Sequence, residues 1–247
     1  MLRIATAQPI ISSDPKKNAA EICDLIRAAA AAGADCIHFP EAALSGYVKS
    51  EIKSWSDVDW EALGTALESV RACCAGTGVW AFVGCNHRHP ELSRPLNSVH
   101  IIDGQGRAAA RYDKRYCSNA EITDWFAVGN QPVTVDIKGI RLGFLICIEV
   151  QFPELFMEYE RLGVDCVCLS SGPGMEMFRI QCQGHAASNC YWLSYSVPEN
   201  GSVKEPSCLI GPNGEILAPC GRGASGPGRS SGGVGRSGAR AALRPAR

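Results

Sequence analysis

Short apolar segments alternate with amphipathic segments along most of the chain, and this alternation restricts the fold to layered α/β architectures. Residues 2–7 alternate like a strand, residues 18–32 carry apolar side chains at helical spacing and end at Gly33, and residues 36–39 form a second apolar run. The chain therefore opens with a strand, a helix and another strand.

The same alternation continues as far as residue 220. Helices are expected over 60–74, 154–161 and 178–189, and strands over 80–84, 98–102, 107–112, 133–137, 140–146, 165–170, 191–197, 207–210 and 215–218. The dipeptides Asp103-Gly104 and Lys138-Gly139 each separate two expected strands and predict hairpins. Helices mixed with hairpins predict a mixed α/β layer architecture, not a purely parallel doubly wound sheet.

Cys147 stands at the end of one of these apolar segments. Residues 142–148 are nearly all apolar and predict a buried strand, and Pro153 opens a helix after a short turn. Folds of the α/β class place reactive groups at the carboxyl ends of strands. The N–H groups and dipole of a following helix would favour the thiolate. Cys147 is therefore a candidate nucleophile, with a packed core thiol as the alternative interpretation.

A carboxylate and an ammonium group follow two other expected strands. Glu41 comes directly after the segment CIHFP, and Lys114 follows the strand that ends near Tyr112. Three reactive groups at three strand ends could converge at one mouth of a sheet. Taken singly, Glu41 could cap the next segment and Lys114 could be a solvated lysine.

Three segments together carry a resemblance to a known family. FPEAALSGY, YDKRYC and LICIEVQFPEL resemble, in this order, the three catalytic motifs of the nitrilase (carbon–nitrogen hydrolase) superfamily, and the resemblance runs from about residue 2 to about residue 218. It implies a four-layer α–β–β–α sandwich of the nitrilase type, in a homo-oligomer if the carboxyl-terminal end permits. It also implies Cys-dependent hydrolysis of a non-peptide C–N bond, most simply in a small amide, through a thioester intermediate.

The resemblance assigns a catalytic triad to the three motifs. Cys147 would be the nucleophile, and Glu41 would move protons if desolvation raises its pKa towards neutrality. Lys114 would stabilise the developing oxyanion, and the backbone N–H of Ile148 would add a second donor. No histidine, metal ion or cofactor is needed for this chemistry.

Further positions have supporting roles or structural alternatives. Glu121 resembles the second glutamate that many family members place between the lysine and the cysteine, where it orients the lysine and the substrate; Asp124 is the alternative in a shifted register. Tyr47 would line the pocket or pack in the core. Glu149 matches an acidic position of the family and is interpreted as structural.

Two alternatives to an amidase remain open. A nitrilase acting on a small nitrile belongs to the same class, although such nitrilases usually carry Trp directly after the cysteine, where this chain has Ile148. The carbamoyl-hydrolysing branch often has basic residues soon after its cysteine, and IEVQFPEL has none. From a different class, an abnormal carboxyl-terminal end favours a catalytically impaired interaction protein.

Composition excludes several other classes. The chain is 46% hydrophobic and 20% charged, which is typical of a soluble globular protein. No apolar run reaches the roughly 18 residues of a membrane span, and the amino end does not resemble a secretory signal, so we expect a cytoplasmic protein. The 13 cysteines are odd in number and form no CxxC pair, which argues against disulfides and metal binding.

The composition changes abruptly at Gly221. Residues 221–247 contain eight Gly, six Arg and four Ser without an acid, whereas residues 1–220 contain 18 basic and 25 acidic residues. We therefore predict a hydrolase domain over 1–220 and a disordered tail over 221–247, which would leave a sheet edge exposed near Ala218. Arg-Gly runs can bind RNA, but the chain lacks an aromatic platform, so nucleic acid is not an expected partner.

Overall fold

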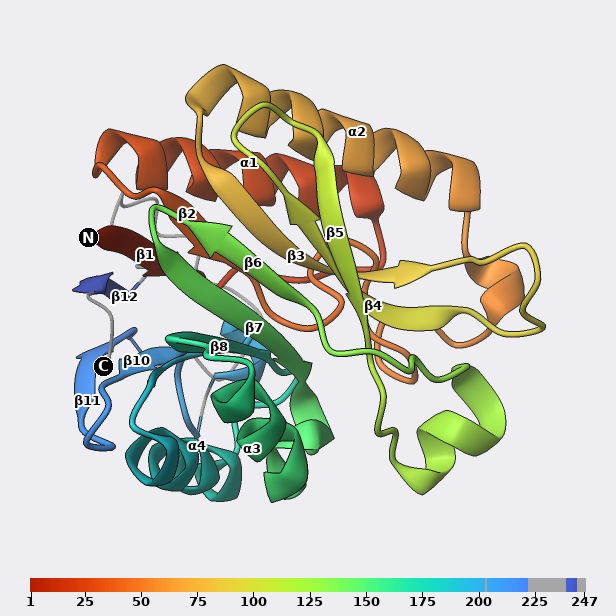
Figure 1. Cartoon of the computed structure of the whole chain (residues 1–247). Coiled ribbons are helices and arrows are strands. Elements are labelled where there is room, and N and C mark those ends of the chain that lie inside the picture. Colours follow the sequence, from red (N-terminus) through yellow and green to blue (C-terminus); the bar gives the residue numbers. More distant parts are fainter. Residues whose placement is uncertain (203, 222–238, 244–247) are drawn as a thin grey trace.

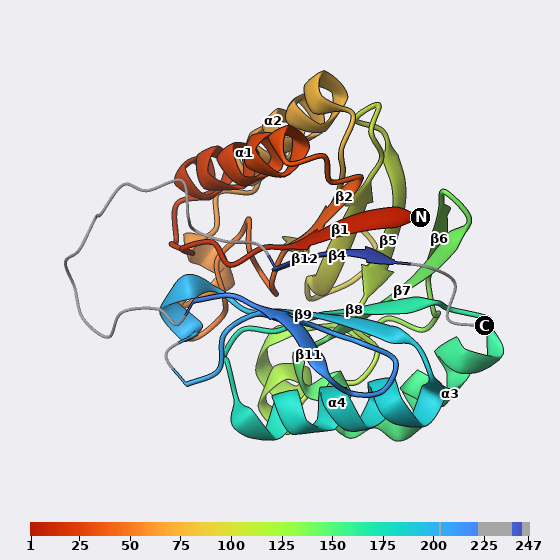
Figure 2. The ribbon, with the colours of Figure 1, turned by 90° about the vertical axis from the view of Figure 1, so that its left-hand side faces the viewer.

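The computed structural model describes residues 1–202, 204–221 and 239–243. Two six-stranded sheets lie face to face and helices cover their outer faces (Figures 1 and 2). Helices α1 (Pro15–Ala31) and α2 (Trp60–Thr77) cover one sheet, and α3 (Pro153–Arg161) and α4 (Glu176–Asn189) cover the other. This order of layers confirms the predicted α–β–β–α sandwich. None of the helices in the described ranges is long and apolar enough to cross a membrane.

Each sheet mixes parallel and antiparallel strands. The first has the order β12–β1–β2–β3–β4–β5, and the second β11–β10–β9–β8–β7–β6. The first contains β1 (Leu2–Thr6), β2 (Cys36–His38), β3 (Trp80–His87), β4 (Leu96–Ile102), β5 (Ala108–Asp113) and β12 (Ala239–Leu243). The second contains β6 (Thr134–Ile137), β7 (Ile140–Ile146), β8 (Cys166–Ser170), β9 (Trp192–Ser196), β10 (Cys208–Ile210) and β11 (Ile216–Pro219). All helices and strands predicted up to residue 220 are present, with ends that differ by no more than three residues.

Local chemistry explains where the first helix and the β6–β7 hairpin form. The Asp14 side chain accepts hydrogen bonds from the N–H groups of Lys16 and Lys17, so α1 begins at Pro15, earlier than the apolar spacing alone suggested. In the β6–β7 hairpin, Lys138 and Gly139 have φ angles of 52° and 77°. Two left-handed residues are what a tight type I′ turn requires.

The central strands are buried on both faces, which explains their continuous apolar runs. Ile4 and Phe82 face the second sheet, and their neighbours Ala5 and Val83 pack beneath α1 and α2. The rings of Phe82 and Phe144 meet with centroids 5.0 Å apart across the space between the sheets. The sandwich therefore has one core that extends from between the sheets to the space beneath α3 and α4, and a second beneath α1 and α2.

A buried polar cluster also joins the sheets. His38 Nδ1 lies 2.8 Å from Ser194 Oγ, and His38 Nε2 lies 2.9 Å from Ser170 Oγ. Thr6 Oγ1 lies 2.7 Å from the same Ser194 hydroxyl. His38 is fully buried, and burial lowers its pKa to about 3. The imidazole is therefore neutral and links β2 to β8 and β9.

One segment of the expected tail, residues 239–243, forms strand β12 in the structure. This strand pairs antiparallel with β1, with Leu243 opposite Leu2, and Leu243 is fully buried. The free edge of β1 offers backbone N–H and C=O groups to any extended segment, and 239–243 contains no glycine. Residues 222–238 and 244–247 of the expected tail lie outside the described residues. At the other sheet, β11 forms the edge that was expected near Ala218.

Candidate active site

The three residues predicted to form the triad follow strand ends that meet between the sheets. Glu41 follows β2 and Lys114 follows β5, both in the first sheet, whereas Cys147 follows β7 in the second. Strand β3 is parallel to β2, and β4 is antiparallel to both β3 and β5, so β2 and β5 end at the same side of the sheet. The exposed fractions are 1% for Glu41, 0% for Lys114 and 7% for Cys147.

A glycine and an asparagine bring Glu41 towards Lys114. A Cβ atom on Gly84 of β3 would lie 2.1 Å from the Pro40 carbonyl oxygen, so only glycine lets the turn after β2 cross this strand. Beyond the crossing, Asn97 of β4 donates its side-chain N–H to Glu41 Oε1 at 2.7 Å. The Asn97 carbonyl accepts the Lys114 backbone N–H at 2.8 Å. Sequence reasoning missed Asn97 because a polar residue at the start of a strand carries no distinct signal.

Lys114 lies between two carboxylates. Its Nζ is 2.6 Å from Glu121 Oε1 and 3.3 Å from Glu41 Oε1. The other Glu121 oxygen accepts the Ser118 N–H at 2.8 Å, within the turn that opens the short π-helix η2 (Glu121–Trp125). Asp124 is exposed to solvent. The structure therefore places Glu121, and not Asp124, beside the lysine.

The charges of this cluster shift the protonation equilibria in different directions. Burial raises the pKa of Glu41, and nearby Glu121 adds to this effect while Lys114 opposes it. Burial would also raise the pKa of Glu121, but its ion pair with Lys114 brings that pKa below its ordinary value. Burial opposes the ammonium form of Lys114, yet Glu41, Cys147 and Glu121 hold its pKa well above the ordinary value. Lys114 is therefore charged, and Glu41 is the carboxylate whose pKa is raised towards neutrality.

Cys147 occupies a sharp backbone turn. It has a φ angle of 54° and begins the 3₁₀ turn η3 (Cys147–Gln151), and left-handed non-glycine residues of this kind cluster at functional sites. Burial and the Glu41 carboxylate raise the pKa of the thiol to about 12, although Lys114 and the Gly172 N–H act in the opposite direction. The expectation that a helix N-terminus favours the thiolate is wrong, because η3 separates Cys147 from α3 and burial dominates.

A cavity of about 300 Å³ opens onto Glu41. Tyr47 and Gly172 line it together with Ile11, Pro173 and Pro198, so much of its wall is apolar. Glu41 Oε2 is buried and accepts no hydrogen bond from a nitrogen or oxygen donor of the described residues, but the Cys147 thiol hydrogen-bonds to the Glu41 carboxylate.

Two further predicted site residues lie at this cavity or beside Cys147. Tyr47 is half-buried and lines the cavity, and Glu41 is the main cause that raises its phenol pKa above the ordinary value. Ile148 is half-buried and follows Cys147 within η3. The structure therefore places Glu41 and Tyr47 at this cavity and Cys147 and Ile148 in η3, with the Cys147 thiol within hydrogen-bond reach of Glu41.

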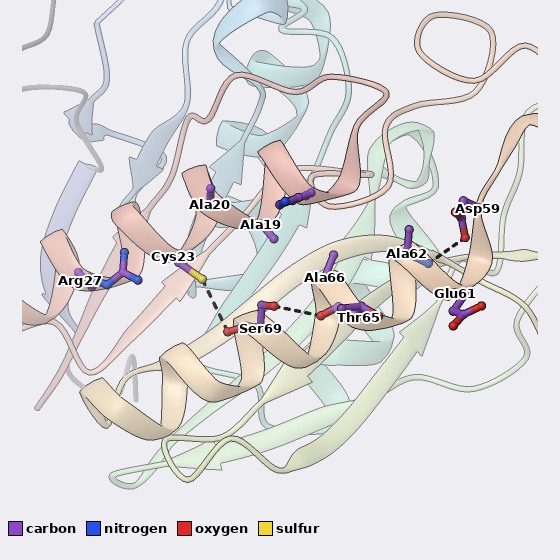
Figure 3. A pocket seen from close by; sticks show the side chains of 11 residues that line it. Ala19, Ala20, Cys23, Arg27, Asp59, Glu61, Ala62, Thr65, Ala66 and Ser69 are labelled. Carbon is purple, nitrogen blue, oxygen red and sulfur yellow. Dashed lines mark hydrogen bonds between the residues drawn. The ribbon is translucent and has the colours of Figure 1, made fainter.

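A larger groove lies elsewhere on the molecule. It has a volume of about 700 Å³ and runs between α1 and α2 (Figure 3). None of the triad residues lines it, and the thiol on its wall, Cys23, donates to the Ser69 carbonyl oxygen at 3.8 Å. Burial raises the pKa of Cys23 to about 12. The carboxylates that line the groove, Asp59 and Glu61, are exposed, whereas Glu41 is buried. The smaller cavity at Glu41 is therefore the better candidate for chemistry.

The cysteines and histidines form no metal centre in the part of the chain that the structure describes. No group of three or more His, Cys, Asp or Glu side chains within this part could hold a metal ion. All 13 cysteines lie inside it, and none of them forms a disulfide bond there.

Comparisons with known proteins agree with this fold and show the family. A hydrolase of Mycobacterium tuberculosis (strain H37Rv) is 27% identical over 91% of this chain and 80% of its own length, and a nitrilase of Bradyrhizobium diazoefficiens is 25% identical over 86% and 78%. The structure of an amidase from Nesterenkonia sp. AN1 superposes with a TM-score of 0.80 over 90% of both chains at 24% identity, which shows a shared fold. The carbon–nitrogen hydrolase family model matches residues 3–227. With that match across most of the chain, this protein belongs to the carbon–nitrogen hydrolase family of the nitrilase superfamily.

Proposed function

We propose that the protein hydrolyses the C–N bond of a small carboxamide through a thioester on Cys147. The observation that carries this proposal is a buried carboxylate with a raised pKa, Glu41, that shares one site with the Lys114 ammonium and the Cys147 thiol. Each group has the chemistry that one step of amide hydrolysis requires. The relatives named as amidases support the same reaction class.

The first half of the reaction forms the thioester. Glu41 takes the proton from the Cys147 thiol as the sulfur attacks the amide carbonyl carbon. The carbonyl oxygen becomes an oxyanion, which the Lys114 ammonium and the backbone N–H of Ile148 stabilise in a site that excludes bulk water. Glu41 then gives its proton to the leaving nitrogen, the C–N bond breaks, and ammonia or an amine departs.

The second half releases the acid. A water molecule attacks the thioester carbonyl while Glu41 accepts one of its protons, and the same oxyanion donors act again. The C–S bond then breaks, and the proton on Glu41 returns to the Cys147 sulfur. Glu121 remains ionised beside Lys114 throughout, because its pKa is lowered by that ion pair, and so keeps the ammonium in place.

The Glu41 carboxylate favours an amide over a nitrile. Its Oε2 is buried and receives no N–H or O–H hydrogen bond among the described residues, and the Cys147 thiol is the donor beside it. An amide nitrogen carries N–H groups that can add a second donor to this carboxylate, whereas a nitrile nitrogen carries none. A hydrogen bond to a charged group contributes about 1.5–3 kcal/mol, so we expect the amide to be the better substrate.

Matched pairs of substrates test this proposal. Purified protein would be assayed for ammonia release with propionamide and propionitrile, which share one carbon skeleton, and with larger amides to probe the limit set by a cavity of about 300 Å³. We expect turnover of the amide, slower or no turnover of the nitrile, and none in Cys147→Ala. Faster hydrolysis of the nitrile would make the protein a nitrilase, and full activity of Cys147→Ala would refute the mechanism.

A further inference from the structure

Glu149 has more hydrogen-bond donors around it than an ordinary structural carboxylate. Its side chain is fully buried, two residues after Cys147. Oε1 accepts from the Arg115 and Tyr116 backbone N–H groups at 2.8 and 3.1 Å. Oε2 accepts from the Ile146 backbone N–H at 2.7 Å. The Tyr112 hydroxyl lies within hydrogen-bond distance of both oxygens, at 2.8 and 2.9 Å.

These donors flank the two groups of the proposed reaction that come from different sheets. Three of the donors flank Lys114 in sequence at the end of β5 in the first sheet: Tyr112, Arg115 and Tyr116. The fourth, Ile146, directly precedes Cys147 at the end of β7 in the second sheet. No strand pairing connects the two sheets among the described residues, and stacked sheets are separated by about 10 Å of side chains. The Glu149 carboxylate therefore crosses this gap beside the reacting groups.

We propose that Glu149 is a positioning residue that sets the Lys114 ammonium relative to the Cys147 sulfur. The inference rests on the proposed function, because it assigns a purpose to this geometry within the hydrolysis. Glu149 touches neither sulfur nor substrate cavity, so it acts through the backbone on either side of Lys114 and through the residue before Cys147.

The carboxylate form is the one that fits the site. Each hydrogen bond to Glu149 comes from an N–H or O–H group, so both oxygens have to accept. Burial raises the pKa of Glu149, while these donors and nearby Lys114 favour its ionised form. In Glu149→Gln, one oxygen becomes an NH₂ group that faces N–H donors. One of the two backbone segments would then lose its anchor and shift.

The test compares Glu149→Gln with two other variants. Tyr112→Phe removes a single donor and keeps all the backbone donors. Glu158→Gln is the matched control: Glu158 pairs with the Arg115 side chain at 2.7 Å but contacts no backbone near Lys114. We expect Glu149→Gln to lower kcat about tenfold or more with KM changed less than about threefold, because small displacements of reacting groups are costly. Tyr112→Phe should lose less, and Glu158→Gln should stay within about twofold of wild type.

A second measurement does not depend on turnover. Lys114 lowers the pKa of the Cys147 thiol. Displacing the ammonium should therefore slow the alkylation of Cys147 by iodoacetamide at pH 9. Peptide mass mapping measures the rate at this cysteine. In a Lys114→Met background, Glu149→Gln should cause no further slowing, since the ammonium whose distance from the sulfur it sets is then absent. A general structural role would instead slow alkylation in both backgrounds.

The outcomes separate the two proposals. Wild-type protein that alkylates at Cys147 but hydrolyses no amide would refute the proposed function, and the alkylation comparison would still test Glu149. A folded Glu149→Gln protein with wild-type kcat and alkylation rate would overturn the positioning role. If Glu149→Gln fails to fold, Glu149→Asp decides: it keeps the charge but draws the carboxylate back by one methylene from its backbone donors, and a wild-type kcat and alkylation rate in that variant would refute the inference.

Discussion

At Cys147, burial and the neighbouring Glu41 carboxylate raise the thiol pKa to about 12, so the sulfur is protonated in the resting protein. A thiol of this kind is a poor nucleophile until a base removes its proton. Cysteines elsewhere share the raised pKa without such a base, as Cys23 shows. The structure therefore suggests that the location of the base, and not an intrinsically acidic thiol, distinguishes Cys147.

The first prediction at the residue scale concerns the nucleophile. Cys147→Ala should abolish turnover, and mass spectrometry of substrate-treated wild type should find an acyl adduct on Cys147. Cys117 is the matched control, because it is half-buried and feels the charges of Lys114 and Glu121. Cys117→Ala should keep activity. An adduct on Cys117, with activity surviving Cys147→Ala, would contradict the assignment.

The second prediction concerns Glu41 and pH. A general base has to be deprotonated, and burial raises the pKa of Glu41 above its ordinary value of 4.5. Activity should therefore rise with pH through the raised pKa, so that the acidic limb of kcat/KM lies above pH 4.5. Glu41→Gln has nearly the same shape but cannot carry a proton, and should lose at least about 100-fold in kcat.

A pH–rate profile of kcat/KM and the kcat of the variant check this prediction. The apparent pKa belongs to the coupled Glu41–Lys114–Glu121 cluster and not to one residue. Retention of a tenth of the wild-type kcat by Glu41→Gln would show that another group moves the proton.

At the scale of elements, β12 is the outer strand of the first sheet and pairs with the edge of β1. Leu243 is fully buried on this strand, whereas Leu217, on the edge strand β11 of the other sheet, is 46% exposed. We expect Leu243→Ala to lower the free energy of unfolding by about 2–5 kcal/mol and Leu217→Ala to lower it much less. Urea denaturation of both variants provides the measurement.

Amide hydrogen exchange supplies an independent check on β12. Slow exchange is expected across 239–243, because these residues pair with β1. Fast exchange there, together with equal stabilities of the two leucine variants, would return this segment to the disordered tail predicted from composition. The first sheet would then have β1 as its edge.

For the whole molecule, the buried His38 cluster couples the stability of the sandwich to pH. The folded-state pKa of His38 is about 3, against an ordinary value of 6.5, so the unfolded chain binds a proton more readily. The stability that His38 contributes is present above pH 6.5 and is lost as the pH falls from 6.5 towards 3. The loss should be on the order of a few kcal/mol at the acidic end.

His38→Gln isolates this effect, because glutamine can hydrogen-bond but does not titrate. Wild type should lose stability between pH 6.5 and 4 more steeply than His38→Gln, as measured by chemical denaturation at each pH. His100, whose pKa burial also lowers to about 3, is present in both proteins and cancels in the comparison. Parallel curves would show that His38 does not set the acid sensitivity.

Much of the fold and of the candidate site could be predicted, because the spacing of apolar residues within a short segment indicates which of its faces is buried. Alternation and helical spacing located the strands and helices, and the residue types after β2, β5 and β7 suggested Glu41, Lys114 and Cys147 as a group. Asn97 and Gly84 escaped prediction, since their roles come from a turn that crosses β3 and reaches β4. Such contacts depend on strand order, which the pattern of one segment does not encode.

The sequence alone determined which segments are strands and helices and which side chains stand at their ends, because periodicity and residue type are properties of short stretches. The tertiary structure decided that the Cys147 thiol is protonated, that Glu121 meets Lys114, that Glu149 links the two sheets and that 239–243 pairs with β1. Each of these depends on groups far apart in the chain. Desolvation and hydrogen bonding are set by what packs around a residue, and only the assembled sandwich specifies those neighbours.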